Sequence, residues 1–243
     1  VLGCATAAGP AFEGARMADG VRAGDSAVAR LTFERDSWKL SRQTIGNVKP
    51  IGVCGSAYVD FLAEGARHGF LLPGGRFNRE HPAVQRYAHH KVNCHALCFE
   101  VAKRHGGDAV CITEADLASL LQAKAAIAAG ILTLLARAGL TPADVATLYL
   151  AGGFGMHMNT ANAIRCGLLP GFRLDQVRLV GNTSLAGAYA ALLDRGLLAD
   201  IATAAADMQI VELNLEPGFE DRYIDQLALE VGDAAADALA AQP

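Results

Sequence analysis

The positions of apolar residues along the chain predict an alternation of strands and helices. Residues 28–35 alternate apolar and polar side chains, which is the period of a half-buried strand. Residues 147–153 form a nearly continuous apolar run that ends in glycines, as a strand in a covered sheet does. Helical segments and further apolar strands follow with short links between them. This order is typical of an α/β domain whose sheet is covered by helices.

Local signals predict where several elements begin and end. Thr113 and Asp116 resemble a helix capping box, and the segment that follows, up to Ala138, is apolar nearly all round. A helix with that profile is buried on most faces, and Gly139 is a suitable stop after it. The other predicted strands lie within 1–10 and at 177–182, with one hairpin within 36–50 and another of strands 95–101 and 109–112. The other predicted helices lie at 58–69, 159–169 and 184–195, and a short one starts at Thr141. Residues 73–91 are predicted to be irregular, and 199–243 to hold one helix, one strand and a frayed acidic end.

Composition and charge narrow the class of protein. The 243 residues are 52% hydrophobic and 19% charged, with a formal net charge of −4. This length can bury a substantial core, and the apolar content is too high for a disordered protein. The slightly acidic balance argues against a nucleic-acid partner. No uncharged apolar run of about 20 residues occurs, so no membrane span is expected. We expect a cytoplasmic protein.

The cysteines predict reduced thiols rather than a disulfide scaffold. They are scattered among apolar neighbours without the rhythm of a small disulfide-bonded domain. The six are Cys4, Cys54, Cys94, Cys98, Cys111 and Cys166. Cys94, His95 and Cys98, near His89 and His90, raise the question of a metal site. The Cys-x-x-x-Cys spacing is loose and no second pair follows at zinc-finger distance, so we favour structural thiols and predict no metal ligands.

Three strand ends in the chain carry glycine-rich turns. Glycine lets the backbone approach a ligand closely, and backbone N–H groups at the start of a helix suit phosphate or another anion. The alternative at each turn is ordinary helix capping by Ser or Thr. Three such turns in one α/β domain favour a nucleotide-type site. They contain Gly52, Gly55 and Ser56, then Gly152 and Gly153, then Gly181, Asn182 and Thr183.

Other common motifs are missing from the sequence. No GxxxxGK(S/T) loop occurs, which excludes a P-loop NTPase within this chain. No GxGxxG follows a strand and no GxSxG elbow is present, so a dinucleotide fold and a hydrolase of those types have no support.

Lys124 is the one charge in the middle of the long apolar helix. Its ammonium either snorkels to the surface or contacts a ligand where the helix lines a cleft.

Five motifs, in their order along the chain, resemble one protein family. They are GPAFEGA (9–15), IGVCGSAYVDFLAE (51–64), ITEADLASLLQAKAAIAAGI (112–131), LYLAGGFG (148–155) and GNTSLAGA (181–188). The family is the reductive activators of corrinoid proteins, which are iron–sulfur ATPases of the acetate kinase, sugar kinase, heat-shock protein and actin superfamily. The resemblance covers roughly residues 3–225. It implies a ribonuclease-H-like ATPase lobe over 1–243, with an inserted α+β subdomain at about 28–112.

The resemblance also implies roles for individual residues. The strand that ends in Gly152 and Gly153 matches the motif that packs against the adenosine part of a nucleotide. Glu13 is a candidate contact to metal or water, and no catalytic residue is assigned. The full set of candidate nucleotide-binding residues is Gly9, Pro10, Glu13, Gly55, Ser56, Gln122, Lys124, Gly152, Gly153, Phe154 and Asn182.

The start of the chain departs from the family pattern. Family members carry a ferredoxin-like iron–sulfur domain and acidic phosphate motifs before the point that corresponds to Val1, and neither occurs here. The resemblance therefore implies the C-terminal part of an activator that returns inactive cobalt(II) corrinoid proteins to cobalt(I) for methyl transfer. ATP with Mg is implied for the full-length protein, and an iron–sulfur cluster only for the missing N-terminal region. We expect this part alone to be inactive as an ATPase.

Two other functions remain open from the sequence. The first is a nucleotide-independent module that docks a corrinoid protein or forms a homodimer. The second is a small-molecule kinase of the same superfamily, which has less support because no substrate-binding loop with a catalytic Asp is visible. Nucleotide binding separates the activator from the docking module.

Overall fold

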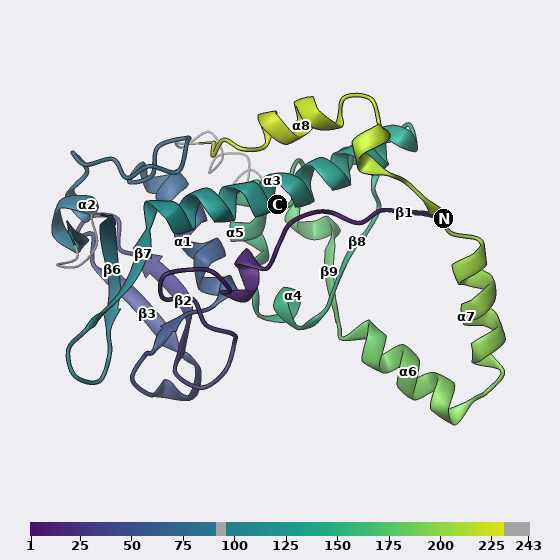
Figure 1. Cartoon of the computed structure of the whole chain (residues 1–243), viewed down its shortest axis with the longest axis horizontal. Helices are drawn as coiled ribbons and strands as arrows, with labels where there is room; N and C mark the ends of the chain where they lie inside the picture. Colours follow the sequence, from purple (N-terminus) through teal and green to yellow (C-terminus); the bar gives the residue numbers. More distant parts are fainter. Residues whose placement is uncertain (91–95, 231–243) are drawn as a thin grey trace.

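The chain folds into a mixed α/β structure with one long helix across it. The computed structural model describes residues 1–90 and 96–230. Helix α3 (Glu114–Arg137) runs along the molecule (Figure 1). Two three-stranded sheets lie towards the end of the molecule where α3 begins, and strands β8 and β9 lie beyond its middle.

The strands form four small sheets among the described residues. Strand β2 (Ala27–Phe33) pairs antiparallel with β3 (Leu40–Thr44) and parallel with the short β4 (Gly52–Val53). Strands β5 (Ala88–His90), β6 (Leu97–Lys103) and β7 (Ala109–Thr113) form an antiparallel sheet, which confirms the predicted hairpin of the last two. Strands β8 (Leu148–Ala151) and β9 (Val177–Gly181) are parallel, as are β1 (Leu2–Gly3) and β10 (Gln209–Ile210).

The helices follow the local signals closely. Thr113 and Asp116 form the predicted capping box, in which the Thr113 hydroxyl accepts from the Asp116 N–H at 3.2 Å and Asp116 accepts from the Thr113 N–H at 2.9 Å. The remaining helices are α1 (Gly55–His68), α2 (Pro82–Tyr87), α4 (Gly153–His157), α5 (Thr160–Arg165), α6 (Thr183–Leu193), α7 (Leu197–Ala206) and α8 (Phe219–Asp225).

Four sequence predictions about elements differ from the structure. The hairpin predicted within 36–50 is wrong, because β3 pairs with β2 rather than with a strand inside that range. The segment 73–91 is not irregular, because it contains α2 and β5. Pro82 stands in the first turn of α2, and the His81 ring accepts from the Ala83 N–H. The Pro and His residues that suggest an irregular segment are therefore the ones that start this helix. The predicted strand within 1–10 shrinks to β1. The end of the chain holds a second helix, α8, and its predicted frayed part, 231–243, lies outside the described residues.

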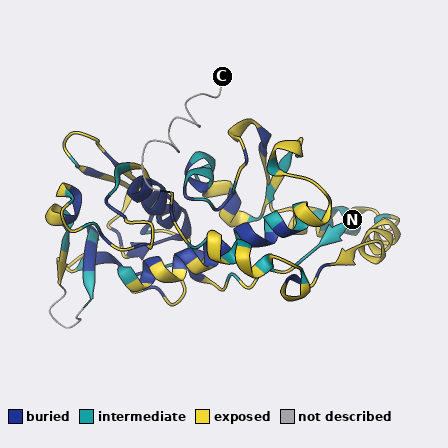
Figure 2. Ribbon diagram, turned by 90° about the horizontal axis from the view of Figure 1, so that it is seen from above, coloured by how far each residue is buried: buried dark blue, intermediate teal, exposed yellow. Residues whose placement is uncertain are grey.

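Phenylalanines fill the core between α1 and the two three-stranded sheets. Phe33, Phe61, Phe70 and Phe99 are buried, with ring centroids 4.8 Å apart for Phe33 and Phe70 and 5.1 Å apart for Phe61 and Phe99. Tilted and edge-on aromatic pairs of this kind stabilise a core beyond their area alone. Buried residues concentrate at this end of the molecule, whereas α6 and α7 are exposed (Figure 2).

Helix α3 belongs to this core although its length and composition would suit a membrane span. Of the most apolar 18-residue stretch of α3, 61% is buried inside the domain. It packs against α8, β7 and the 3-10 turn η1 (Ala11–Glu13). The sequence prediction of a helix buried on most faces is therefore confirmed.

Two carboxylates of α1 accept hydrogen bonds from buried backbone N–H groups of β2. The Leu31 N–H donates to Asp60 Oδ2 at 3.1 Å, and the Phe33 N–H donates to Glu64 Oε2 at 2.9 Å. Strand β4 is too short to reach these two N–H groups, since its register with β2 covers Ala27 and Val28 at the start of that strand. Because unpaired backbone donors are costly when buried, these side chains fix α1 against the sheet.

We expect Glu64→Gln to weaken the fold in a pH-dependent way. Burial alone would raise the pKa of Glu64, but its interactions with His68, the Phe33 N–H and Arg67 outweigh burial and lower this pKa. A carboxylate with a lowered pKa stabilises the folded state above its unfolded pKa of about 4.3 and loses that effect as the pH falls. Urea unfolding at neutral pH should show a loss of about 1–2 kcal/mol in the variant. The loss should shrink as the pH falls through the acidic range. An equal loss at every pH would contradict this account.

Candidate nucleotide-binding cavity

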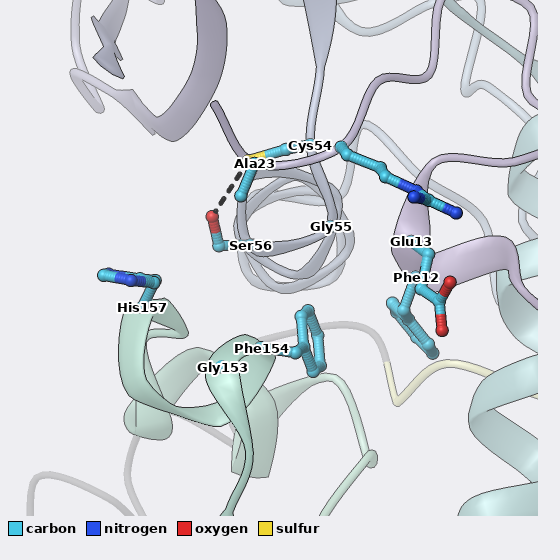
Figure 3. Close-up of a pocket in the computed structure, with 10 residues that line it drawn as sticks. Phe12, Glu13, Ala23, Cys54, Gly55, Ser56, Gly153, Phe154 and His157 are labelled. Carbon is cyan, nitrogen blue, oxygen red and sulfur yellow. Dashed lines mark hydrogen bonds between the residues drawn. The ribbon is translucent and has the colours of Figure 1, made fainter. Parts of the chain in front are cut away.

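A cavity of about 260 Å³ lies where four segments of the chain meet (Figure 3). Its walls come from η1, from the loop before β2, from the start of α1 and from α4. The lining residues are Phe12, Glu13, Arg22, Ala23, Cys54, Gly55, Ser56, Gly153, Phe154 and His157.

The start of α1 offers free hydrogen-bond donors to this cavity. Cys54 precedes the helix in an extended conformation and makes no side-chain cap. Among the described residues, no group accepts from the N–H groups of Gly55 and Ser56. The Ser56 hydroxyl instead donates to the Ala29 carbonyl at 2.8 Å, so the capping interpretation does not hold for Ser56. Free N–H groups and the helix dipole together favour an anion at this end of α1.

Three glycines at the cavity differ in why glycine stands there. A Cβ on Gly55 would lie 1.9 Å from the Phe12 carbonyl oxygen and 2.8 Å from the Phe154 ring, so only glycine allows α1 to start this close to η1 and α4. Gly152 has φ of +96°, a conformation that favours glycine. A Cβ on Gly153 would meet nothing within 4 Å. A side chain at Gly153, which lines the cavity, would therefore meet open space.

Aromatic and charged side chains complete the walls. The Phe12 and Phe154 rings lie 5.6 Å apart between centroids, tilted by 34°. In Figure 3 these two rings lie on one side of the cavity with Glu13, and His157 lies across from them near Ser56. Arg22 adds a positive charge to the lining. Flat apolar rings and free donors in one hollow suit a ligand with both an aromatic and an anionic part.

The structure brings five of the predicted residues together and separates the others. Those that line the cavity are Glu13, Gly55, Ser56, Gly153 and Phe154. Gly152 adjoins Gly153 as the residue that caps α4.

The other predicted residues do not line this cavity. Gly9 and Pro10 are exposed just before η1, and Gln122 is exposed on α3. Asn182 caps α6, because its Oδ1 accepts from the Leu185 N–H at 3.0 Å.

The structure contradicts one of the two hypotheses for Lys124 and places its side chain in a cavity other than the predicted one. Its side chain is only 1% exposed and does not snorkel to the surface, and it lines a second cavity of about 290 Å³ rather than the one at Gly153. Its ammonium donates to the Ala228 carbonyl at 2.8 Å. Burial lowers the pKa of Lys124, although Cys166 and Glu230 act in the opposite direction. Burial likewise raises the pKa of the adjacent Cys166 thiol to about 11.

Sequence reasoning missed half of the residues around the cavity. They are Phe12, Arg22, Ala23, Cys54 and His157. Phe12 and Cys54 stand inside the motifs GPAFEGA and IGVCGSA, and His157 follows the glycine-rich LYLAGGFG, so proximity to a motif could have found these three. Arg22 and Ala23 carry no such signal, since only tertiary folding brings their loop to the cavity.

The cysteines also pair differently from the sequence prediction. Cys98 on β6 and Cys111 on β7 are joined by a disulfide, with Cα atoms 5.4 Å apart, so the prediction of reduced thiols is wrong for this pair. Cys4, Cys54 and Cys166 are free. Cys94 and His95 lie outside the described residues.

Comparison with known proteins assigns the chain to a family. Residues 1–238 match the family described as the C-terminal domain of RACo, the ASKHA domain. The chain belongs to this family. The match confirms the predicted actin-like ATPase fold class, and the observed mixture of helices and small sheets agrees with it.

Related proteins are much longer than this RACo C-terminal domain. The chain is 31% identical to the corrinoid activation enzyme RamQ of Eubacterium limosum, over 90% of the chain but only 38% of RamQ. It is 24% identical to the Co(II) methylated amine-specific corrinoid protein reductase of Methanosarcina barkeri, over 94% of the chain and 42% of that protein. A solved structure of a reductive activator for corrinoid, iron–sulfur protein superposes with a TM-score of 0.85 at 35% identity, over 94% of this chain and 36% of the other.

Proposed function

We propose that this domain is the C-terminal part of an ATP-dependent reductive activator that returns inactive cobalt(II) corrinoid proteins to cobalt(I) for methyl transfer. The names of its relatives support the activity, because they describe a corrinoid activation enzyme, a corrinoid protein reductase and a reductive activator. The partner is then a corrinoid protein, and the working compartment is the cytoplasm. The iron–sulfur cluster that the family resemblance implies belongs to a part of the longer protein outside these 243 residues.

The observation that carries the nucleotide part of this proposal is the start of α1. The N–H groups of Gly55 and Ser56 are without acceptors among the described residues, and they border the same cavity as Gly153. These donors fit a phosphate group, and the rings of Phe12 and Phe154 fit an adenine base. Glu13 would hold a Mg²⁺ ion directly or through water, since hard cations prefer carboxylate oxygen. The residues present therefore fit ATP with Mg.

The size of the cavity supports a nucleotide site that this domain shares with other parts of the longer protein. Its volume of about 260 Å³ is below the roughly 300–1,000 Å³ of common ligand pockets, so it would hold part of a nucleotide. The relatives are more than twice as long as the region they share with this chain. We infer that other parts of the longer protein complete the contacts to the phosphates.

The energetic role of ATP follows from the reaction. Reducing cobalt(II) to cobalt(I) is uphill, so the activator must draw free energy from another process. ATP binding or hydrolysis is coupled to the reduction only if the nucleotide favours one state of the protein over another. A cavity whose walls come from η1, the loop before β2, α1 and α4 suits this role, because closing or opening it would move these separate segments relative to one another.

Calorimetric titration with Mg-ATP and Mg-ADP tests the proposal. The longer parent protein should bind both, and this domain alone should bind more weakly because it holds part of the site. Cobalt(II) corrinoid protein should be reduced by the parent with an electron donor only when ATP is added. If the parent binds neither nucleotide at millimolar concentration, the ATPase assignment fails.

A second candidate function, docking without nucleotide, has one observation in its favour. Large apolar side chains of α6 and α7 are exposed, a pattern that marks interaction surfaces. They include Leu185, Tyr189, Leu192, Leu193, Leu198 and Ile201. Sedimentation of the domain with and without cobalt(II) corrinoid protein tests this function. Complex formation that ignores nucleotide would favour docking over the ATPase.

A further inference from the structure

Three metal-ligand side chains from three adjacent strands meet on one face of the β5–β6–β7 sheet. His89 lies directly opposite Cys98 in the register of β5 and β6. Cys111 lies on β7 opposite Glu100, two residues from Cys98, and so on the same face of the pleat. The imidazole nitrogen and the two sulfur atoms all lie within 4.8 Å of one another.

The surroundings of these three side chains differ from those of a core disulfide. Cys98 and Cys111 are each 1% exposed, whereas His89 is exposed, so the sulfurs lie beneath a histidine that reaches solvent. Phe99 points to the opposite face of β6, into the aromatic core. The Cys111 backbone is also fixed, since its N–H donates to Asp19 Oδ2 at 2.8 Å. The cluster is therefore separate from the core and from the cavity at Gly153.

We propose that His89, Cys98 and Cys111 bind one thiophilic divalent cation such as Zn²⁺ when the two cysteines are reduced. Two thiolates and an imidazole are ligands that zinc prefers, and three protein ligands leave its fourth position to water. Tetrahedral zinc places neighbouring ligand atoms about 3.5 Å apart, which small side-chain rotations would reach from the separations seen here. Metal binding releases the two thiol protons to solvent.

The disulfide in the structure is then the metal-free form of the same site. Disulfide sulfurs are not thiolate ligands, so bound metal and disulfide exclude each other. Oxidation by an azodicarboxamide removes one electron from each thiolate, forms the Sγ–Sγ bond and releases the cation. The azo reagent takes up these two electrons and two protons and becomes a hydrazine. The proposal replaces the prediction of no metal ligands, because the partner of Cys98 is set by strand pairing rather than by sequence spacing.

Cobalt(II) titration of the chain, reduced with a phosphine and freed of metal, tests the site. We expect one cobalt per chain and the thiolate-to-cobalt absorption band in the near ultraviolet. Cys98→Ser and Cys111→Ser should each remove that band. His89→Ala should weaken cobalt binding at least about tenfold, since it removes one of three ligands. Competition by zinc should displace the cobalt.

Matched controls make the test decisive. His90→Ala removes the neighbouring histidine, whose strand partner is Leu97, and Cys4→Ser removes a free cysteine elsewhere. Both should leave cobalt affinity unchanged. Because His89 is exposed, its variant should fold, and circular dichroism checks every variant. The proposal is overturned if the reduced chain binds no cobalt, if His89→Ala binds as tightly as the unmodified chain, or if the azodicarboxamide-oxidised chain retains the site.

Discussion

Replacing Gly153 with tryptophan is expected to block nucleotide binding and leave the domain folded. A Cβ at this position meets no atom within 4 Å, and its φ is not one that requires glycine, so the fold tolerates a side chain here. The added indole would enter a cavity of only about 260 Å³. We expect binding of Mg-ADP by the longer parent protein to weaken about a hundredfold or more, which is about 2.7 kcal/mol. Calorimetry measures the affinity, and circular dichroism with thermal unfolding measures the fold.

Two other glycines provide the comparison. Gly187→Trp on α6 also places a side chain in open space, away from the cavity, and should leave nucleotide affinity unchanged. Gly55→Val should instead destabilise the domain, because its Cβ would overlap the Phe12 carbonyl. A folded Gly153→Trp variant with full affinity for Mg-ADP would place the nucleotide elsewhere.

The parts of the fold predicted from the sequence are those with local causes. The capping box of Thr113 and Asp116 and the stop at Gly139 depend on residues within one or two turns, so they define α3 without the rest of the chain. The β6–β7 hairpin also has its turn residues between its strands. The α/β class follows from the order of such segments, and the family match confirms it.

The parts not predicted depend on residues far apart in the chain. Arg22 reaches the cavity only because its loop packs beside the start of α1, and no property of its own segment shows this. The sequence predicts Gly55 as a turn residue, but its close approach to Phe12 and Phe154 follows from the packing of three elements. Likewise the sequence spacing links Cys98 with Cys94, whereas the structure joins Cys98 to Cys111 on the neighbouring strand.

The long-range role of Asp60 leads to the largest expected loss of stability. Asp60 Oδ2 accepts from the Leu31 N–H at 3.1 Å, and Oδ1 accepts from the Asn162 side-chain amide at 2.7 Å. One buried carboxylate thus joins α1, β2 and α5. Burial raises the pKa of Asp60, although hydrogen bonds from Asn162 and Leu31 and the charge of Arg30 oppose this.

We expect Asp60→Ala to lower the free energy of unfolding by about 4 kcal/mol, because two buried donors lose their acceptor at about 1–3 kcal/mol each. Asp60→Asn should cost less, since its amide oxygen still accepts one of the two bonds. The control is Asp175→Ala, whose carboxylate is 70% exposed and, within 1–90 and 96–230, bonds to the side chain of Arg173 alone; it should change stability by no more than about 0.5 kcal/mol. Urea unfolding of the three variants measures these differences. In a double-mutant cycle with Asn162→Ala, a coupling energy of about 0.5–3 kcal/mol is expected for residues in direct contact. A coupling near zero would mean that Asp60 does not hold α5 against α1, and the packing of α5 on α1 would have to depend on other residues.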